Sequence, residues 1–371
     1  MKLYNTLRNI INATLEHNTG TKALDKIVHV PVLANEIIET LSPQDGQHFI
    51  DMTFGGGGHT KRLLTTQKRI TIFALDRDPE AFQRAIVLSK DLANKKNGQT
   101  LIPLLGRFSE LNSLMNNFQV PHNFFDGAIM DLGASSFQFE NGSRGFSLKL
   151  NGPLDMRMDC NRFPNMPSAA DVINSLDAED LAKIFRTYGE EKQASKVAHA
   201  IVDSRFMMKS LNSTGELAIL VSSVLGNVGS DKLGRPAHSA TKVFQALRIF
   251  VNNELNELNY GIELLSRYMK IGKCPNKENI VTTDRYGGGL LAAISFHSLE
   301  DKLLKRHFMG LDESSQVNPL EYGVYDNSVN LKKRNKKWSF YKDRLFYPSE
   351  KEVLLNPRAR SAKLRIAVRL D

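Results

Sequence analysis

The residues best suited to chemistry lie in and around the segment Asp51–Thr60, which reads Asp-Met-Thr-Phe-Gly-Gly-Gly-Gly-His-Thr. Glycines let a backbone turn sharply and approach a ligand, and a helix after such a loop offers free N–H groups. Asp76 ends the next apolar run, roughly 20 residues beyond the loop, where a carboxylate can accept hydrogen bonds from both hydroxyls of a ribose. This spacing predicts a site for an adenosine-containing cofactor, and a purely structural tight turn is the alternative.

The loop also indicates which cofactor the site takes. A nicotinamide or flavin site has the pattern G-x-G-x-x-G, whose third glycine permits close packing of helix on strand. Here the pattern is Gly55-x-Gly57-x-x-Thr60, so the third glycine is missing. The acidic Asp51 before the loop suits S-adenosylmethionine, because this ligand carries an ammonium and a sulfonium and has no phosphate.

Polar or glycine residues also follow the other apolar runs that read as strands. Gly106-Arg107-Phe108 follows the third run and offers an aromatic ring to cover an adenine, Asp131–Ser136 and then Gln138 follow the fourth, and Ser295–Asp301 follows the fifth. Ligands of a doubly wound sheet gather at the carboxyl ends of its strands. We therefore expect these segments to face one cleft.

Asp131 is the strongest candidate for a catalytic role. Methyl transfer from a sulfonium is an in-line displacement, so an enzyme must chiefly orient donor and acceptor. A carboxylate that accepts a hydrogen bond from the exocyclic amine of a nucleobase would help to localise its lone pair. Asp131 could instead hold the cofactor or cap the following turn, and the sequence leaves these three roles open.

The sequence favours neither a metal site nor a nucleophilic cysteine. His297 and Glu300 could supply two metal ligands, but no third ligand with suitable spacing is evident. We expect His297 to position substrate, or the following helix to be capped through Ser298. Cys160 and Cys274 lie outside the strand ends and have no metal-type spacing.

Strand-like runs alternate with helical patterns, which predicts an α/β fold with a parallel, doubly wound sheet. The predicted strands are His48–Thr53, Ile70–Leu75, Thr100–Leu105, Gly127–Met130, Leu290–Phe296 and Leu364–Leu370. Between the fourth and fifth, the predicted helices are Asp177–Tyr188, Lys192–Met208, Thr214–Leu225 and Thr241–Leu265. This long helical interval predicts a helical domain inserted into the sheet's connections.

We predict three regions along the chain. Residues 1–24 are basic, amphipathic and poor in acids, which is typical of an organelle transit peptide, although a plain N-terminal helix would look similar. Residues 25–143 and 262–371 form the cofactor-binding domain, and residues 144–261 form the inserted domain. Lys273–Arg285 and Asp312–Leu345 read as loops, and the basic run Lys332–Lys337 in the second could contact RNA phosphates or be merely solvated.

Candidate substrate contacts lie mainly in the inserted domain. The segments that contain Arg144 and Phe146, and then Asp155 and Arg157, could close over a splayed base or form a packed hinge. Lys242, Gln245 and Arg248 recur at helical spacing, so their face could bind RNA phosphates or be solvated. The formal charge of +9 and the pI near 9.3 favour a polyanionic partner. No apolar run is long enough to cross a membrane.

Ten blocks of the sequence, in order from about residue 29 to the C-terminus, resemble the MraW/RsmH methyltransferases. They are His29–Leu33, Asp51–Thr60, Asp76–Pro79, Asp131–Ser136, Arg144–Ser147, Gly152–Asp159, Tyr188–Glu191, Phe244–Arg248, Ser295–Asp301 and Asn356–Ser361. The resemblance implies a class I, Rossmann-like methyltransferase fold with an inserted helical domain. It also implies S-adenosylmethionine-dependent methylation of the N4 amine of a cytidine in small-subunit ribosomal RNA. The residues that it implies as cofactor contacts are Gly57, Gly58, His59, Asp76, Phe108, Asp131 and Gln138.

The sequence departs from the bacterial pattern of this family at a few places. Lys242 stands where an arginine is usual, Phe137 stands where a proline is usual, and Lys273–Arg285 is an insertion. With its N-terminal extension the chain is similar to the mitochondrial member, which implies mitochondrial small-subunit rRNA or a pre-ribosomal subunit as partner. We expect the protein to be located in the mitochondrial matrix, or in the cytoplasm if the extension is not a transit peptide.

Two alternatives to this function are a non-catalytic ribosome-assembly factor that binds rRNA and a methyltransferase with another nucleic-acid substrate. Ser295 and His297 complete the candidate substrate contacts.

Overall fold

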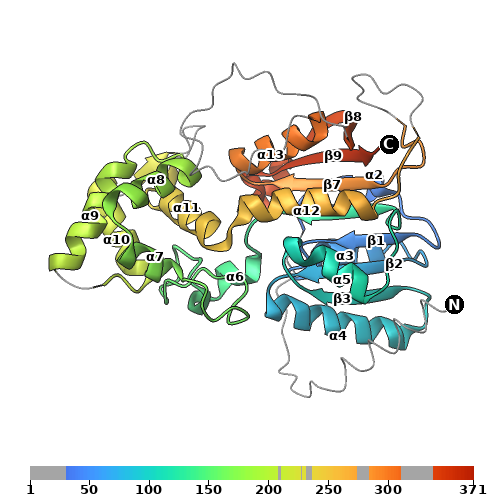
Figure 1. The fold of residues 1–371 in the computed structure, drawn as a ribbon, viewed down its shortest axis with the longest axis horizontal. Coiled ribbons are helices and arrows are strands. Elements are labelled where there is room, and N and C mark those ends of the chain that lie inside the picture. The colour runs from blue at the N-terminus through green and yellow to red at the C-terminus, as the bar shows by residue number, and fades with distance from the viewer. Residues whose placement is uncertain (1–30, 208–209, 227, 231–235, 274–283, 311–336) are drawn as a thin grey trace. The chain divides into compact units, whose positions relative to one another are not determined.

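The computed structural model describes residues 31–207, 210–226, 228–230, 236–273, 284–310 and 337–371. They form two compact units, shown in Figure 1. The sheet unit comprises residues 31–133, 257–310 and 337–371, and the helical unit comprises residues 134–256. The units therefore meet along the chain at 133/134 and 256/257, whereas the sequence prediction placed these boundaries at 143/144 and 261/262.

The sheet unit contains a seven-stranded sheet with the order β3-β2-β1-β4-β7-β9-β8. Its strands are β1 (His48–Asp51), β2 (Thr71–Asp76), β3 (Thr100–Leu105), β4 (Gly127–Asp131), β7 (Leu290–Ser295), β8 (Trp338–Phe346) and β9 (Lys363–Arg369). The first five strands in this order are parallel, and the order reverses between β1 and β4, as in Rossmann-like sheets. The α/β fold class and all six predicted strands are confirmed.

Two details of the sheet differ from the prediction. The sheet is not parallel throughout, because β9 pairs antiparallel with both β7 and β8. The interpretation of Asp312–Leu345 as a loop is wrong at its end, since β8 begins at Trp338. β8 is an edge strand with a shift of register between Phe340 and Leu345, and such irregular edges carry a weak alternating pattern.

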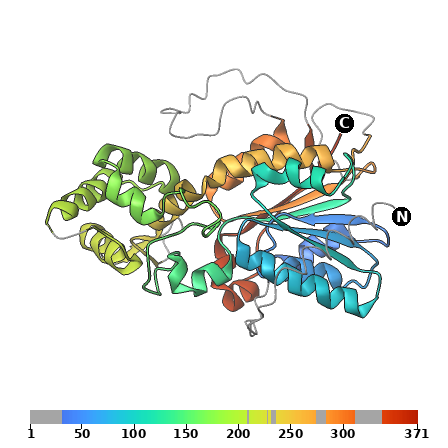
Figure 2. The ribbon, with the colours of Figure 1, turned by 60° about the horizontal axis from the view of Figure 1, so that its bottom comes forward.

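Helices cover both faces of the sheet, with α5 and α12 on one face and α4 on the other (Figure 2). The helices of this unit are α2 (Ala34–Leu41), α3 (Gly58–Leu64), α4 (Pro79–Lys95), α5 (Leu111–Asn117), α12 (Glu254–Tyr268, which belongs to this unit from Glu257 on), α13 (Ser298–Met309) and α14 (Glu350–Leu355). α4 begins directly after β2 because Pro79 occupies its first turn and the Asp78 side chain accepts a hydrogen bond from the Glu80 N–H (2.9 Å). All six residues of β7 are buried, as expected for a central strand.

The helical unit contains α6 (Ser136–Glu140), α7 (Ala169–Ser175), α8 (Ala178–Gly189), α9 (Ala194–Met207), α10 (Thr214–Leu225) and α11 (Thr241–Asn252), with a hairpin of β5 (Val228–Ser230) and β6 (Pro236–His238). Three of the four predicted helices are confirmed with small shifts of their ends. The single helix predicted over Thr241–Leu265 is wrong, because the chain breaks at Asn253. This residue adopts the left-handed conformation (φ 51°), which ends α11 immediately before α12 begins.

Several predicted segments lie outside the described residues. They are residues 1–24, most of Lys273–Arg285, and the basic run before Lys337. Within the described ranges, none of the helices is both long and apolar enough to span a lipid bilayer.

Candidate cofactor and catalytic site

The glycine loop after β1 adopts a backbone conformation that residues with a Cβ atom would strain. Gly55 and Gly57 have φ angles of 52° and 76°. A Cβ atom on Gly57 would lie 2.7 Å from the Phe54 ring, so no larger residue fits there without a shift. Gly56 is different, because it is exposed and a Cβ there would meet nothing within 4 Å. The loop therefore needs glycine at Gly57 and brings its backbone close to the carboxyl end of β1.

Asp76, the last residue of β2, joins its strand to this loop. One carboxylate oxygen accepts a hydrogen bond from the Gly55 N–H (2.7 Å) and the other accepts one from the Asp78 N–H (2.9 Å). Burial raises the pKa of Asp76 to about 7, although both backbone hydrogen bonds act to lower it. Each oxygen keeps a second lone pair, so the carboxylate can still accept two hydroxyl hydrogens. This fits the ribose of an adenosine-containing cofactor.

Asp51 anchors the loop from the other side. Its buried carboxylate accepts hydrogen bonds from the Thr60 hydroxyl (2.7 Å) and the Thr53 N–H (3.1 Å), which ties the first turn of α3 to the end of β1. Burial raises the pKa of Asp51, and the nearby His59 opposes that rise. Thr53 and Thr60 were not among the predicted site residues, although Thr60 lies in the same segment of the sequence.

His59 and Asp131 form the most distinctive pair of the site. The His59 Nε2 atom lies 3.3 Å from Oδ2 of Asp131, and the imidazole is buried. Burial of the imidazole acts to lower the pKa of His59. The hydrogen bond and the charge of Asp131, together with the charge of Asp51, outweigh burial, so the pKa of His59 is raised. The Asp131 N–H donates to the Thr53 hydroxyl (2.7 Å), which fixes the residue at the end of β4.

The second carboxylate oxygen of Asp131 lacks the hydrogen bond that a buried acceptor normally receives from the described part of the chain. Among the described residues, Oδ1 is buried and has no hydrogen-bond partner. A buried acceptor without a donor is costly, and such atoms in native proteins call for an explanation such as a bound ligand. The sequence left three roles open for Asp131: activation of the amine, binding of the cofactor and capping of the following turn. Within the described residues, Oδ1 accepts no hydrogen bond from that turn, so this atom gives no support to the capping role.

The ends of β3 and β7 carry the remaining predicted residues of the sheet unit. The Phe108 side chain is part-exposed in the turn after β3. Ser295 is buried and its hydroxyl points to the Lys363 carbonyl (3.5 Å). His297 caps α13, because its Nδ1 accepts the Glu300 N–H (3.4 Å) and its Nε2 lies 3.1 Å from the Glu300 carboxylate. The helix cap is thus His297 itself, and the expected cap through Ser298 is wrong.

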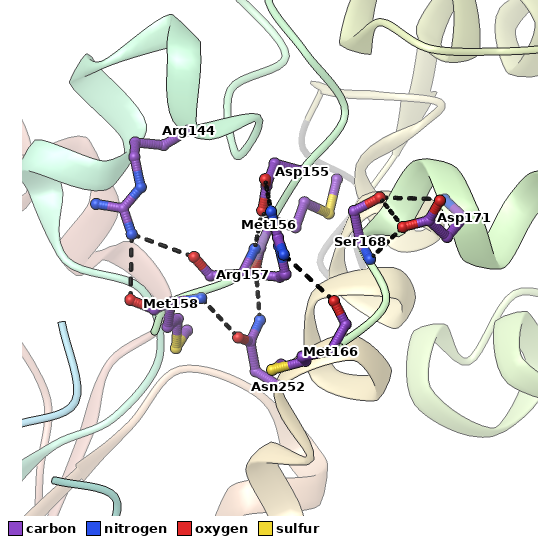
Figure 3. Close-up of polar contacts among 9 residues, drawn as sticks. All are labelled: Arg144, Asp155, Met156, Arg157, Met158, Met166, Ser168, Asp171 and Asn252. Carbon is purple, nitrogen blue, oxygen red and sulfur yellow. Dashed lines mark hydrogen bonds and ion pairs between the residues drawn. The ribbon is translucent and has the colours of Figure 1, made fainter. Parts of the chain in front are cut away.

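Four predicted substrate contacts lie in the helical unit. Asp155 and Arg157 belong to the loop at residues 153–160, and Figure 3 shows them with Arg144. The Arg157 guanidinium forms a bidentate pair with Asp155 (2.9 and 2.7 Å). Arg144 donates to the carbonyls of Arg157 and Met158 (3.2 Å each) and lies over the Phe146 ring at 5.9 Å. Sequence reasoning placed these residues in one region, and the structure shows that they brace one another.

Asn252, which the sequence analysis missed, holds the same loop from α11. Its side chain accepts the Met158 N–H (2.8 Å) and donates to the carbonyls of Met156 (2.7 Å) and Arg248 (2.9 Å), as Figure 3 shows in part. Met156 has a φ of 61°, which is strained for a residue with a side chain. Asn252 is fully buried. The pair Asn252-Asn253 near the end of a helical pattern gives no local signal that one of the two side chains holds a distant loop.

The other predicted contacts of the helical unit also have partners within it. Arg248 forms a bidentate pair with Glu254 (2.8 and 2.9 Å), and the Lys242 ammonium lies 3.8 Å from Glu191. Gln245 donates to the Tyr188 carbonyl (3.2 Å). Gln138 is buried and accepts the Ser135 N–H (2.9 Å). Contact of these residues with RNA or cofactor stays a prediction.

Comparison with known proteins decides the family. A family model described as the MraW methylase family matches residues 26–370, which is nearly the whole chain. The chain belongs to the MraW methylase family. The resemblance seen in the sequence blocks is thereby confirmed.

Relatives from animals and bacteria extend this result. The chain is 42% identical over 359 residues to the human 12S rRNA N(4)-cytidine methyltransferase METTL15, with 92% of this chain and 83% of the human protein covered. It is 38% identical over 352 residues to the ribosomal RNA small subunit methyltransferase H of Parvibaculum lavamentivorans, covering 92% and 89%. A protein of Culex quinquefasciatus that carries the name of a receptor-type tyrosine-protein phosphatase, mosPTP-1, is 46% identical over 354 residues. The chain spans only 22% of that protein, so most of it lies outside this MraW-type region.

Proposed function

We propose that this chain is an S-adenosylmethionine-dependent methyltransferase that acts on the N4 amine of a cytidine in small-subunit rRNA. Membership of the MraW methylase family supports methyl transfer, and the names of the human and bacterial relatives support the rRNA substrate. The human relative is named for 12S rRNA, the small-subunit rRNA of mitochondria, which supports a mitochondrial location and a role in small-subunit assembly. The observation that carries the proposal is the buried Oδ1 atom of Asp131 at the end of β4, which none of the described residues pairs.

The residues of the glycine loop and its neighbours fit the cofactor. Gly57 lets the loop turn closely over the Phe54 ring, and the Asp76 carboxylate keeps a lone pair on each oxygen for the ribose hydroxyls. The part-exposed ring of Phe108 would cover the adenine. S-adenosylmethionine supplies an electrophilic methyl group on a sulfonium. Gln138 remains a predicted contact from the helical unit.

Asp131 would orient and activate the acceptor. His59 holds one carboxylate oxygen at 3.3 Å and Thr53 holds the backbone N–H, so Oδ1 has a fixed direction. An amine N–H that donates to Oδ1 would satisfy this buried acceptor. The same hydrogen bond would help to localise the lone pair on the amine nitrogen, where it forms the new bond to the methyl group. The carboxylate also offers a place for the proton that the amine must lose. A contact of Asp131 with the cofactor's ammonium would serve orientation instead.

The loop braced by Asn252 would receive the RNA in the helical unit. Arg144 and Arg157 are held by carbonyls and by Asp155, so they would meet RNA with little loss of side-chain freedom. Phe146 is buried and supports Arg144 rather than presenting its own face. The net charge of +9 favours binding to phosphates in general.

A methylation assay with purified protein tests this function. Small-subunit rRNA or pre-ribosomal subunits would be incubated with labelled S-adenosylmethionine, and nucleosides would be identified by mass spectrometry. We expect N4-methylcytidine with the wild-type chain and none with Asp131→Ala. Binding of rRNA without any methylated nucleoside would support the alternative of a non-catalytic assembly factor, and another methylated nucleic acid would identify a different substrate.

A further inference from the structure

One face of α12 (Glu254–Tyr268) contacts the turn that follows β3 at two points and the first turn of α5 at a third. The Glu257 carboxylate accepts hydrogen bonds from the N–H and the hydroxyl of Ser109, both at 2.9 Å. Gly261 packs against Phe108, and the Tyr268 hydroxyl donates to the Asn112 side chain (2.8 Å). Positions 257, 261 and 268 recur at helical spacing and so lie on one face. All of these residues belong to the sheet unit.

Gly261 is an unusual residue for the middle of a helix. Glycine weakens a helix interior because it has the greatest backbone freedom to lose. The structure supplies a reason, since a Cβ on Gly261 would lie 3.0 Å from both Cβ and Cδ2 of Phe108 and 3.1 Å from Cγ. That spacing is tighter than ordinary van der Waals contact. The glycine therefore lets the Phe108 side chain lie directly against the backbone of α12.

Glu257 fixes the neighbouring residue. Its carboxylate is buried, with 7% of the residue exposed, and both of its oxygens accept hydrogen bonds from Ser109. A buried charged side chain destabilises the folded state unless hydrogen bonds compensate for the loss of water. Its two bonds leave the backbone at Ser109 little freedom. The side chain of Phe108, one residue earlier, is thereby held between a fixed backbone and the helix.

We propose that Glu257 and Gly261 are positioning residues that set the direction of the Phe108 ring, and that they thereby determine the affinity for the adenine end of the cofactor. This inference rests on the proposed function, because it assumes that Phe108 faces S-adenosylmethionine. Neither residue contacts the reacting atoms, so both act through Phe108. Substitutions at Glu257 and Gly261 should therefore lower the affinity for the cofactor in a chain that still folds.

The test uses the full chain and calorimetry with S-adenosylhomocysteine, the stable product of the cofactor. Gly261→Ala must displace the ring by a few tenths of an ångström and should weaken binding by about fivefold, the scale of an ordinary single substitution. Gly261→Leu should weaken it further. In the Phe108→Ala background, which has no ring to displace, neither substitution should weaken binding again. Tyr260→Ala, on an exposed position of the same helix, is the matched control and should bind like wild type.

The possible outcomes separate this inference from the proposed function. A wild-type chain that does not bind S-adenosylhomocysteine contradicts the proposed function and removes the basis of the inference. Wild-type binding with unchanged affinity in Gly261→Leu overturns the inference alone, as does an equal loss with and without the Phe108 ring. Should Gly261→Leu fail to fold, Glu257→Ala carries the same cycle, because it removes both hydrogen bonds that Ser109 donates. Its loss of affinity should likewise vanish in the Phe108→Ala background.

Discussion

His59 and Asp131 approach within 3.3 Å across the gap between the glycine loop and the end of β4. This contact joins the loop that would hold the cofactor to the carboxylate that would receive the acceptor amine. Asp51 adds a second acid near the same imidazole, and both acids raise the pKa of His59. The consequence is a fixed Asp131 side chain, with Oδ2 beside His59 and with Oδ1 unpaired within the ranges that the structure describes.

Replacement of Asp131 should stop methyl transfer without preventing cofactor binding. We expect Asp131→Ala and Asp131→Asn to reduce single-turnover methylation at saturating cofactor by roughly 10²-fold or more, because a positioned proton acceptor contributes rate on this scale. Asn keeps the shape but lacks the charge, so it separates activation from packing. Near-normal turnover in either variant would show that Asp131 does not activate the amine.

Cofactor affinity should depend on pH through Asp76. Its pKa of about 7 means that the carboxylate is mostly protonated at pH 6 and mostly ionised at pH 8. Only the ionised form accepts hydrogen bonds from two hydroxyls while keeping both backbone bonds. Affinity should therefore rise with pH, by up to about tenfold between pH 6 and 8. Calorimetry with 5′-methylthioadenosine avoids titration of the cofactor's amino group, and a flat profile would contradict the assignment of Asp76 to the ribose.

Adjacent glycines of the loop should respond differently to the same change. Gly57→Ala should lower the free energy of unfolding by about 1–2 kcal/mol, because alanine is strained at φ 76° and its Cβ would meet the Phe54 ring. It should also weaken cofactor binding. Gly56→Ala is the matched control, since its site is open, and should stay within about 0.5 kcal/mol of wild type. Equal effects at both positions in urea unfolding would contradict this description of the loop.

Asn252 should be among the most sensitive positions of the helical unit. Asn252→Ala removes three hydrogen bonds and leaves the Met158 N–H and the Met156 carbonyl without this partner. We expect a loss of about 2–4 kcal/mol in the free energy of unfolding. Asn256→Ala, which removes a solvent-exposed hydrogen bond to Asn253, should change stability by less than about 0.5 kcal/mol. A small effect at Asn252 would show that the 153–160 loop does not depend on it.

The parts of the fold that sequence could predict are those with strong local patterns. Thr100–Leu105 was predicted to the residue, because its apolar run is bounded by polar residues and glycine. The break at Asn253 was missed, since the helical spacing of apolar residues continues past it through Leu255 and Leu258. The antiparallel pairing of β9 was missed as well. It depends on how the chain returns to the sheet, which periodicity does not describe.

The site shows the same division. Asp51, Asp76 and Asp131 were located from their places at strand ends, because parallel strands bring those ends to one edge. The pairing of His59 with Asp131 and of Gly261 with Phe108 depends on the register of β1 with β4 and on the packing of α12. Such contacts join residues that are distant in sequence. They become visible only when the elements are packed.

The most direct test of the account is mass spectrometry of small-subunit rRNA from cells that lack this protein and are complemented with either wild type or Asp131→Ala. We predict that a single N4-methylcytidine is lost without the protein, is restored by wild type, and is not restored by Asp131→Ala at equal expression. Unchanged N4-methylcytidine in cells without the protein would contradict the central claim.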